Sequence, residues 1–350
     1  MMAWMMPIMM LIMNCITVAI VWFGAKGISA GHMQVGDMMA FITYAMVIVM
    51  SFLLLTMMSI MLPRAGVAAE RIQEVIGTRS SITDAEQLAD DEMGDIRGEL
   101  AFHNVSFAYP NAKDNVLDGL DFEAEPGKTT AIIGSTGCGK STLLNLIPRL
   151  YDVTEGSITL DGVDIRTISQ KKLRDAIGYV PQKAVLFSGD IRSNIKYADE
   201  TISDDRMEEA AAIAQATEFV EEKEKKYDSH IAQGGTNVSG GQKQRLSIAR
   251  AIAKNPKIYL FDDSFSALDY KTDKALRAAL FEHAKDATVI IVAQRISTIL
   301  HADQILVLDD GKIVGKGTHQ ELLKQCQAYQ EIAASQLSQQ EIEKTKGGLA

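Results

Sequence analysis

The chain has 350 residues, a formal net charge of −10 and 47% hydrophobic residues, and this length indicates two domains or one large domain with an appendage. These averages hide a division, because residues 1–63 contain only one basic and one acidic side chain, Lys26 and Asp37, so the whole negative charge lies in the remainder. An acidic chain without a basic stripe argues against a nucleic-acid partner, and its three cysteines have the spacing of neither a disulfide framework nor a zinc site.

The first part of the chain has the pattern of a membrane-spanning helical hairpin. Residues 1–25 and 38–63 are uncharged, and each run is long enough to cross a hydrocarbon core of about 30 Å at about 1.5 Å per residue. A secretory signal peptide is excluded, because the first run has no basic start, is too long and is followed by a second apolar run. We therefore predict a transmembrane part at residues 1–76, with spans at about 4–25 and 38–62 and a second helix that continues to about residue 76.

The charges beside the second span predict its orientation. Arg64 and Arg71 follow it, and basic residues concentrate on the cytoplasmic side, so residue 64 onward is expected in the cytoplasm of a multi-pass cell-membrane protein. Fifteen of the 17 methionines lie in the first 61 residues. They would either line a pliable surface for apolar substrates or, as we favour, face lipid and fill space between helices. Two helices make a poor transport pathway, so we expect this part to be the end of a larger membrane domain.

The soluble part begins with an acidic segment, residues 77–97, which we interpret as a linker rather than a binding tail. From Gly98 short β-branched runs alternate with helical patterns, which predicts a mostly parallel sheet with helices on both faces. We assign residues 98–335 to this domain, within which residues 203–254 are mainly helical, and residues 336–350 to a polar tail. The Gln/Glu-rich stretch from Gln325 is expected to be a solvated or frayed helix. The predicted strands include Leu100–Tyr109, Leu120–Ala124, Thr129–Ile133, Ile258–Asp262, Thr288–Val292 and Ile305–Leu308.

A glycine-rich loop between a predicted strand and a predicted helix has the pattern G-x-x-x-x-G-K-[ST]. Glycines let backbone N–H groups curl around phosphates, and the start of the following helix adds a favourable dipole. Lys140 would reach the terminal phosphates and Ser141 would ligate Mg²⁺. Cys138 lies inside the loop, so a thiol reagent is expected to interfere with nucleotide binding. The loop consists of Gly134, Ser135, Thr136, Gly137, Cys138, Gly139, Lys140, Ser141 and Thr142.

An acidic residue at the end of another predicted strand would complete the nucleotide site. An apolar run follows Lys257 and is followed by Asp262. The Asp262 carboxylate would lie beside the phosphate loop and hold Mg²⁺ through water. Apolar strands that end in Asp are common, so this signal is weak by itself.

Four further segments occur in the order found in ATP-binding-cassette (ABC) proteins, and together they resemble that family over roughly residues 98–325. The segments are Phe107-Ala108-Tyr109-Pro110, Tyr179-Val180-Pro181-Gln182, Val238-Ser239-Gly240-Gly241-Gln242 followed by Arg245, and Ser266-Ala267-Leu268-Asp269. The resemblance implies an α/β P-loop ATPase domain, with a β-subdomain and a helical subdomain, preceded by an all-α transmembrane hairpin.

The resemblance also implies ATP and Mg²⁺ as cofactors. Tyr109 would stack on adenine, Gln182 would act at the metal and in catalysis, and the metal would be held by Ser141, Gln182 and Asp262. Exporter half-transporters of the family have six helices before the cassette, so the two helices here imply a truncated N-terminus or a gene model that begins late. Such subunits pair head to tail. In that arrangement Ser239, Gly240, Gly241 and Gln242 contact the ATP held by the partner.

Two positions depart from the family pattern. Asp263 stands where members that hydrolyse ATP well have Glu, and its shorter side chain withdraws the carboxylate from the reach that a base needs. Gln294 stands in place of the switch histidine and has no imidazole to protonate. Ala232-Gln233-Gly234 also differs from the usual Gly-Glu-Arg. We therefore predict the degenerate subunit of a heterodimeric exporter, with a homodimer in which Asp263 is a slow base as the alternative.

The partners that follow are a second ABC half-transporter, the lipid bilayer and an exported small molecule, lipid or peptide. A soluble cassette protein that acts on DNA or ribosomes is disfavoured, because such proteins lack membrane spans.

Overall fold

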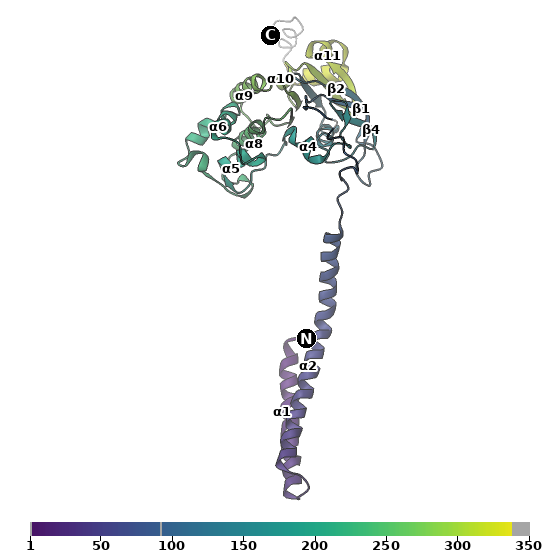
Figure 1. Cartoon of the computed structure of the whole chain (residues 1–350), viewed down its shortest axis with the longest axis vertical. Helices are drawn as coiled ribbons and strands as arrows, with labels where there is room; N and C mark the ends of the chain where they lie inside the picture. Colours follow the sequence, from purple (N-terminus) through teal and green to yellow (C-terminus); the bar gives the residue numbers. More distant parts are fainter. Residues whose placement is uncertain (1, 92, 338–350) are drawn as a thin grey trace. The chain divides into compact units, whose positions relative to one another are not determined.

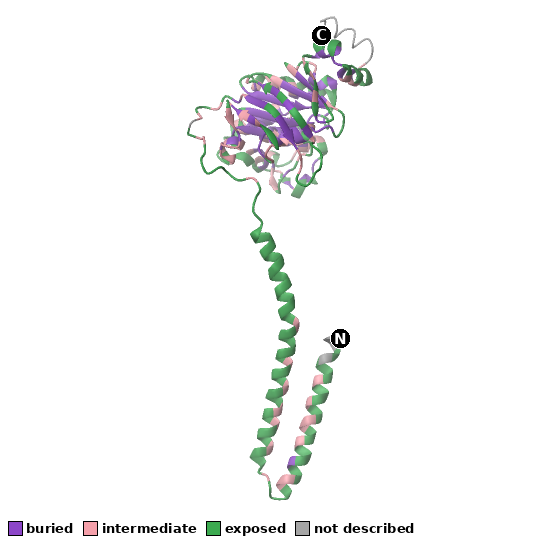
Figure 2. Cartoon of the chain, turned by 90° about the vertical axis from the view of Figure 1, so that its right-hand side faces the viewer, coloured by how far each residue is buried: buried purple, intermediate pink, exposed green. Residues whose placement is uncertain are grey.

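The computed structural model describes residues 2–91 and 93–337, and the chain divides into two compact units, Met1–Ser81 and Ile82–Ala350. The first unit is a helical hairpin of α1 (Met2–Ser29) and α2 (Val35–Gly77). Both helices are long and apolar enough to cross a membrane, and most of their apolar side chains are exposed, as the green colouring in Figure 2 shows.

The two helices of the hairpin approach closely at Gly24. This residue is buried, and a side chain there would meet the Met38 Cγ atom at 2.8 Å, so the Met38 side chain would have to move to make room for it. At the start of α2, the Asp37 carboxylate accepts a hydrogen bond from the Gln34 backbone N–H at 3.0 Å. The helix remains continuous through Pro63 and ends at Gly77.

The second unit is built on a six-stranded sheet in the order β12-β11-β3-β10-β9-β6. Neighbouring strands are parallel except for β11 and β12, which are antiparallel, so the prediction of a mostly parallel sheet is confirmed. The strand bounds are β3 Thr129–Gly134, β6 Ile177–Val180, β9 Ile258–Asp262, β10 Thr288–Val292, β11 Gln304–Asp309 and β12 Lys312–Gly317.

A four-stranded antiparallel sheet, β2-β1-β4-β5, packs on one side of the central sheet, and a two-stranded ribbon pairs β7 with β8. Strand β1 ends at Phe107, two residues before the predicted end at Tyr109, and β2 begins three residues earlier than predicted. The remaining strands are β1 Leu100–Phe107, β2 Leu117–Ala124, β4 Glu155–Leu160, β5 Val163–Asp164, β7 Gly189–Asp190 and β8 His230–Ile231.

Several helices of this unit form a group that lies apart from the antiparallel sheet. Figure 1 shows α5, α6, α8 and α9 gathered away from β1, β2 and β4. The helix bounds are α3 Lys140–Leu146, α4 Gln170–Asp175, α5 Ile191–Ile195, α6 Asp204–Ile213, α7 Thr217–Glu221, α8 Gly240–Lys254, α9 Tyr270–His283, α10 Ile296–Ile299, α11 His319–Gln325 and α12 Gln327–Gln336.

Alternating side chains of the central strands fill two hydrophobic cores. On β9, Tyr259 and Phe261 belong to the core shared with the helical group, whereas Ile258 and Leu260 belong to the core shared with the antiparallel sheet. All five residues of β9 and of β10 are buried. The central sheet is therefore covered on both faces, which fixes the register of its strands and the position of the loops that follow them.

The acidic segment before the sheet is attached to the second unit by specific hydrogen bonds. Asp84 accepts from the Gln170 backbone N–H and Asp90 from that of Ser169, each at 2.9 Å, at the beginning of α4. The backbone hydrogen bond from Gln170 lowers the pKa of Asp84, and the hydrogen bonds from Ser169 lower that of Asp90. The sequence pattern did not reveal these contacts, and Glu92 lies outside the described residues.

The Gln/Glu-rich stretch forms a helix, as predicted, but one face of that helix is buried rather than solvated or frayed. Residues Gln327–Gln336 form α12, in which Tyr329 and Ala333 are fully buried, and the Tyr329 hydroxyl lies 2.7 Å from His319 Nδ1. One aromatic side chain therefore anchors a helix whose composition suggested solvation. The predicted tail at 336–350 lies outside the described residues from 338 onward.

Candidate functional site

A polar cavity of about 350 Å³ lies at the carboxyl ends of β3, β6, β9 and β10. The register explains this convergence, because Val292 pairs with Ile132 on one side and Asp262 on the other, and Val180 pairs with Phe261. The loops that follow these strands therefore meet at one edge of the sheet, as expected for a parallel arrangement. The cavity is lined by Tyr109, Val116, Thr136, Gly137, Gly139, Lys140, Ser141, Thr142, Gln182, Asp262, Asp263, Val292 and Gln294.

The glycine-rich loop needs glycine for steric and conformational reasons. A side chain at Gly134 would place its Cβ 2.0 Å from the Leu308 carbonyl oxygen, and Gly139 has a φ of 99° in the left-handed region. The Lys140 ammonium donates to the carbonyl oxygens of Gly134 at 2.9 Å and Ser135 at 2.6 Å. It lies 3.7 Å from Cys138 Sγ, and Cys138 is buried. The loop is therefore closed around the only cation that lines the cavity among the described residues.

A buried carboxylate faces this loop from the end of β9. Asp262 is 4% exposed, and burial raises its pKa, a shift that a hydrogen bond from Ser141 and the charge of Lys140 oppose. A hydroxyl and a carboxylate are hard oxygen ligands of the kind that Mg²⁺ prefers. The third predicted ligand, Gln182, lines the same cavity, and its amide oxygen remains available because the amide nitrogen points to Asp263. The chemistry of this donor set fits Mg²⁺.

Asp263 and Gln294, the two positions that depart from the family pattern, are hydrogen-bonded to each other. The Asp263 Oδ2 atom accepts from Gln294 Nε2 at 2.8 Å and from Gln182 Nε2 at 3.3 Å. The Asp263 backbone is itself held in the left-handed region, with a φ of 45°, and its N–H donates to the Val292 carbonyl at 2.9 Å. Two amides thus fix the Asp263 carboxylate.

Tyr109, which lines the cavity, belongs to an aromatic cluster. The ring of Tyr109 packs edge-on against Phe107 at 5.0 Å and Tyr151 at 5.3 Å between centroids. Its hydroxyl lies 3.0 Å from Thr142 Oγ1. This contact connects two predicted site residues that are 33 positions apart in the sequence.

The segment 238–242 lies apart from this cavity. Ser239 is the N-cap of α8, where its hydroxyl accepts from the Gln242 N–H at 3.3 Å and Gln242 Oε1 accepts from the Ser239 N–H at 3.0 Å. Ser239 and Gly240 are exposed, and a side chain at Gly240 would meet nothing within 4 Å. A side chain at Gly241 would meet only ordinary contacts, so this chain by itself does not require glycine at either position.

Most of the predicted site residues lie together around the cavity, with three groups elsewhere. Residues 239–242 are not among its described lining residues, and Gly134 and Ser135 face a neighbouring cavity of about 390 Å³. Cys138 is buried and is not among the described lining residues of either cavity. Val116 and Val292 line the cavity without having been predicted, and Val292 is detectable only from the strand register.

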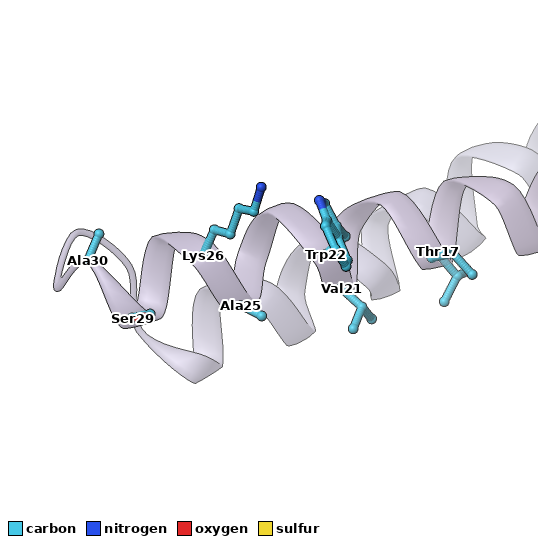
Figure 3. A pocket seen from close by; sticks show the side chains of 8 residues that line it. Thr17, Val21, Trp22, Ala25, Lys26, Ser29 and Ala30 are labelled. Atoms are coloured by element: carbon cyan, nitrogen blue, oxygen red, sulfur yellow. The ribbon is translucent and has the colours of Figure 1, made fainter.

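A larger hollow of about 710 Å³ lies on α1 and is lined by Thr17, Val18, Val21, Trp22, Ala25, Lys26, Ser29 and Ala30. Figure 3 shows Trp22 and Lys26 on the same side of the helix, and the Lys26 ammonium is 5.0 Å from the Trp22 ring centroid. Lys26 is its only charged lining residue. The convergent polar groups of the other cavity therefore mark the candidate site.

Comparisons with known proteins agree with this geometry. Residues 117–266 match the family described as ABC transporter. The chain is 46% identical over 337 residues to an uncharacterized ABC transporter ATP-binding protein of Mycobacterium tuberculosis, covering 95% of this chain and 57% of that protein. A counterpart in Bacillus subtilis is 41% identical over 335 residues, with 96% and 57% covered.

A solved structure is also similar. A bacterial Atm1-family ABC exporter with ATP bound matches with a TM-score of 0.80 and 34% identity, covering 94% of this chain and 57% of that one. The chain thus spans 57% of the length of these relatives. The two apolar helices and the α/β domain that follows them share their fold with an exporter.

Proposed function

We propose that this chain, whose residues 117–266 match the family described as ABC transporter, is a subunit of an ABC exporter. In this proposal it binds and hydrolyses ATP with Mg²⁺ and couples that reaction to export of a small molecule, lipid or peptide. The spans at about residues 4–25 and 38–62 lie in the cell membrane, the helix continues to about residue 76, and residues 98–335 form the cytoplasmic ATPase. The observation that carries the proposal is the cavity that is lined together by most of the glycine loop, Lys140 and Asp262.

The residues around the cavity have complementary roles toward the nucleotide. The backbone N–H groups of the loop and the Lys140 ammonium bind phosphate oxygens, and Tyr109 provides the aromatic face for the base. Ser141, Gln182 and Asp262 hold Mg²⁺, which neutralises phosphate charge when bound. The buried Asp262 has a raised pKa, so a cation at its carboxylate favours the ionised form that is needed there.

Hydrolysis at this site is slow in our proposal, because Asp263 is both short and engaged. A general base needs a carboxylate oxygen within hydrogen-bond reach of the attacking water. The Oδ2 atom of Asp263 already accepts from Gln294 and Gln182. The site therefore binds ATP and turns it over poorly, as in the degenerate half of a heterodimer.

The exposed segment at the start of α8 supports a partner. Neither Gly240 nor Gly241 is required by its own surroundings, and Ser239 presents its hydroxyl at the exposed N-terminus of a 15-residue helix. A helix N-terminus with small residues suits a phosphate that approaches from outside this chain. We propose that a second half-transporter supplies that phosphate on its own ATP, in a head-to-tail pair.

The experiment that tests the proposal uses the full-length chain in lipid nanodiscs, alone and with candidate half-transporters. MgATP binding by the chain alone, and faster hydrolysis when a partner is added, are the expected results. Absence of MgATP binding would overturn the exporter proposal, and fast hydrolysis by the chain alone would favour a homodimer in which Asp263 is the base.

A further inference from the structure

One side chain of the last described helix is bonded to the loop that carries Gln294. The Gln336 Nε2 atom donates to the Gln294 carbonyl oxygen at 2.8 Å, and Gln336 Oε1 accepts from the Ile296 N–H at 2.9 Å. A carboxamide has its donor and acceptor in one plane, so it makes both bonds only while residues 294 and 296 keep their present arrangement.

The second of these bonds serves as the cap of α10. This helix begins at Ile296, and its N-cap residue, Arg295, makes no side-chain capping bond. The first N–H groups of a helix have no partner within it, so Gln336 supplies one from 40 residues further along the chain. Ile296 is itself fully buried, so its packing holds this end of the loop in place.

Packing holds the helix that presents Gln336, although the Gln336 side chain lies at the surface. Tyr329 and Ala333 of α12 are fully buried, and Tyr329 is hydrogen-bonded to His319 of α11. The end of α12 is therefore a firm support for the loop at 294–296.

The residues on either side of Gln294 are held in the core: Ala293 is buried and its N–H donates to the Ile132 carbonyl at 3.1 Å, and Ile296 is fully buried. The cavity of about 390 Å³ between α12 and the glycine loop is lined by Ser135, Thr136, Gln294 and Gln336, among others. Gln294 itself lines this space, and the Gln336 bond to its carbonyl oxygen adds a support there to the one that the core gives its neighbours. From that backbone, the Gln294 side chain reaches Asp263 at 2.8 Å, in the cavity that also holds Lys140.

We infer that Gln336 is a positioning residue for ATP: through the Gln294 backbone it sets the Gln294 amide at the terminal-phosphate end of the cavity. The inference rests on the proposed function, since it concerns how this chain recognises ATP. Lys140 and Asp262 mark the terminal-phosphate end, so an amide set there contacts ATP and not ADP. Gln336 thus contributes to selectivity for ATP over ADP without touching the nucleotide.

The test measures MgATP and MgADP binding to the full-length chain in detergent by isothermal titration calorimetry. Gln336→Ala is expected to weaken MgATP binding roughly 10-fold, as for one lost hydrogen bond to a charged group, and to leave MgADP binding within about twofold. The matched control is Gln330→Ala. This glutamine lies on the same helix and donates to the Leu323 carbonyl at 3.0 Å, so its loss should leave both affinities unchanged.

Two further variants separate positioning from general weakening of the fold. Gln336→Glu retains the acceptor for the Ile296 N–H but loses the donor to Gln294, so it should show the same selective loss with α10 still capped. In a Gln294→Ala background, Gln336→Ala should have no further effect on the ratio of the two affinities.

The outcomes discriminate between the two claims. Unchanged MgATP affinity in Gln336→Ala, or an equal loss of MgATP and MgADP, would overturn the positioning role while leaving the proposed function intact. A wild-type chain that binds no MgATP would overturn the proposed function, and this inference with it.

Discussion

Replacement of Lys140 by alanine should abolish useful ATP binding. Lys140 is the only cation that lines the described cavity, where it faces the carboxylates of Asp262 and Asp263. Without it the lining has two acidic groups and no basic one, so phosphate oxygens meet net negative charge. One or two charge-assisted hydrogen bonds are lost as well, each worth about 1.5–3 kcal/mol. The dissociation constant for MgATP should therefore rise roughly 100-fold or more.

The assay is calorimetric titration of the full-length chain in detergent, with Lys128→Ala as the matched control. Lys128 is half-exposed and pairs with Glu125 at 2.7 Å, away from the cavity, so its loss should not change the affinity. A thermal unfolding midpoint for each variant separates loss of binding from loss of fold. Wild-type affinity in a folded Lys140→Ala chain would show that the glycine loop is not the phosphate site.

Three further perturbations test other parts of the account. Tyr109→Ala should weaken MgATP binding by about 1–3 kcal/mol, as for one lost base-stacking surface, and the same titration would refute the assignment by showing no change. Gly241→Asp should leave nucleotide binding at Lys140 intact but reduce hydrolysis by the assembled pair about 10²–10³-fold. An unaltered rate would mean that the segment 238–242 contacts ATP at the poorly hydrolysing site instead. Burial lowers the pKa of His319, with His301 adding to that shift, so below pH about 6.5 the unfolded chain binds more protons than the folded one. The unfolding temperature measured by calorimetry should therefore fall as the pH decreases from about 6.5, and the slope should be smaller in His319→Gln; equal slopes would show that this histidine does not contribute.

The parts of the site that are continuous in sequence could be predicted from it. The phosphate loop is a local pattern, in which glycines, Lys140 and Ser141 follow a β-branched strand, and an apolar strand that ends in Asp262 is equally local. The mostly parallel sheet followed from the alternation of strands and helices. These features are defined by residues that are close in the sequence, so they can be recognised without the tertiary structure.

The hydrogen bonds that depend on strand register could not be predicted, although the family resemblance pointed to each of the residues that make them. Gln182, Asp263 and Gln294 follow three different strands, and only the pairing of β6, β9 and β10 brings both amides to one carboxylate oxygen. The packing of α12 was missed for a similar reason. Tyr329, Ile332 and Ala333 recur at helical spacing there, but the Gln and Glu residues around them favoured a solvated helix, and the burial of Tyr329 requires the surface of α11.

The claim that this chain holds ATP at a poorly hydrolysing site is tested most directly by the ATP turnover of the full-length chain alone, compared with its Asp263→Asn variant. The account predicts that both bind MgATP and that both hydrolyse it at the same low rate, since the Asp263 carboxylate is engaged by two amides. A rapid turnover that falls about 100-fold in Asp263→Asn would contradict it, because a loss of that size is expected only when the carboxylate acts as the base.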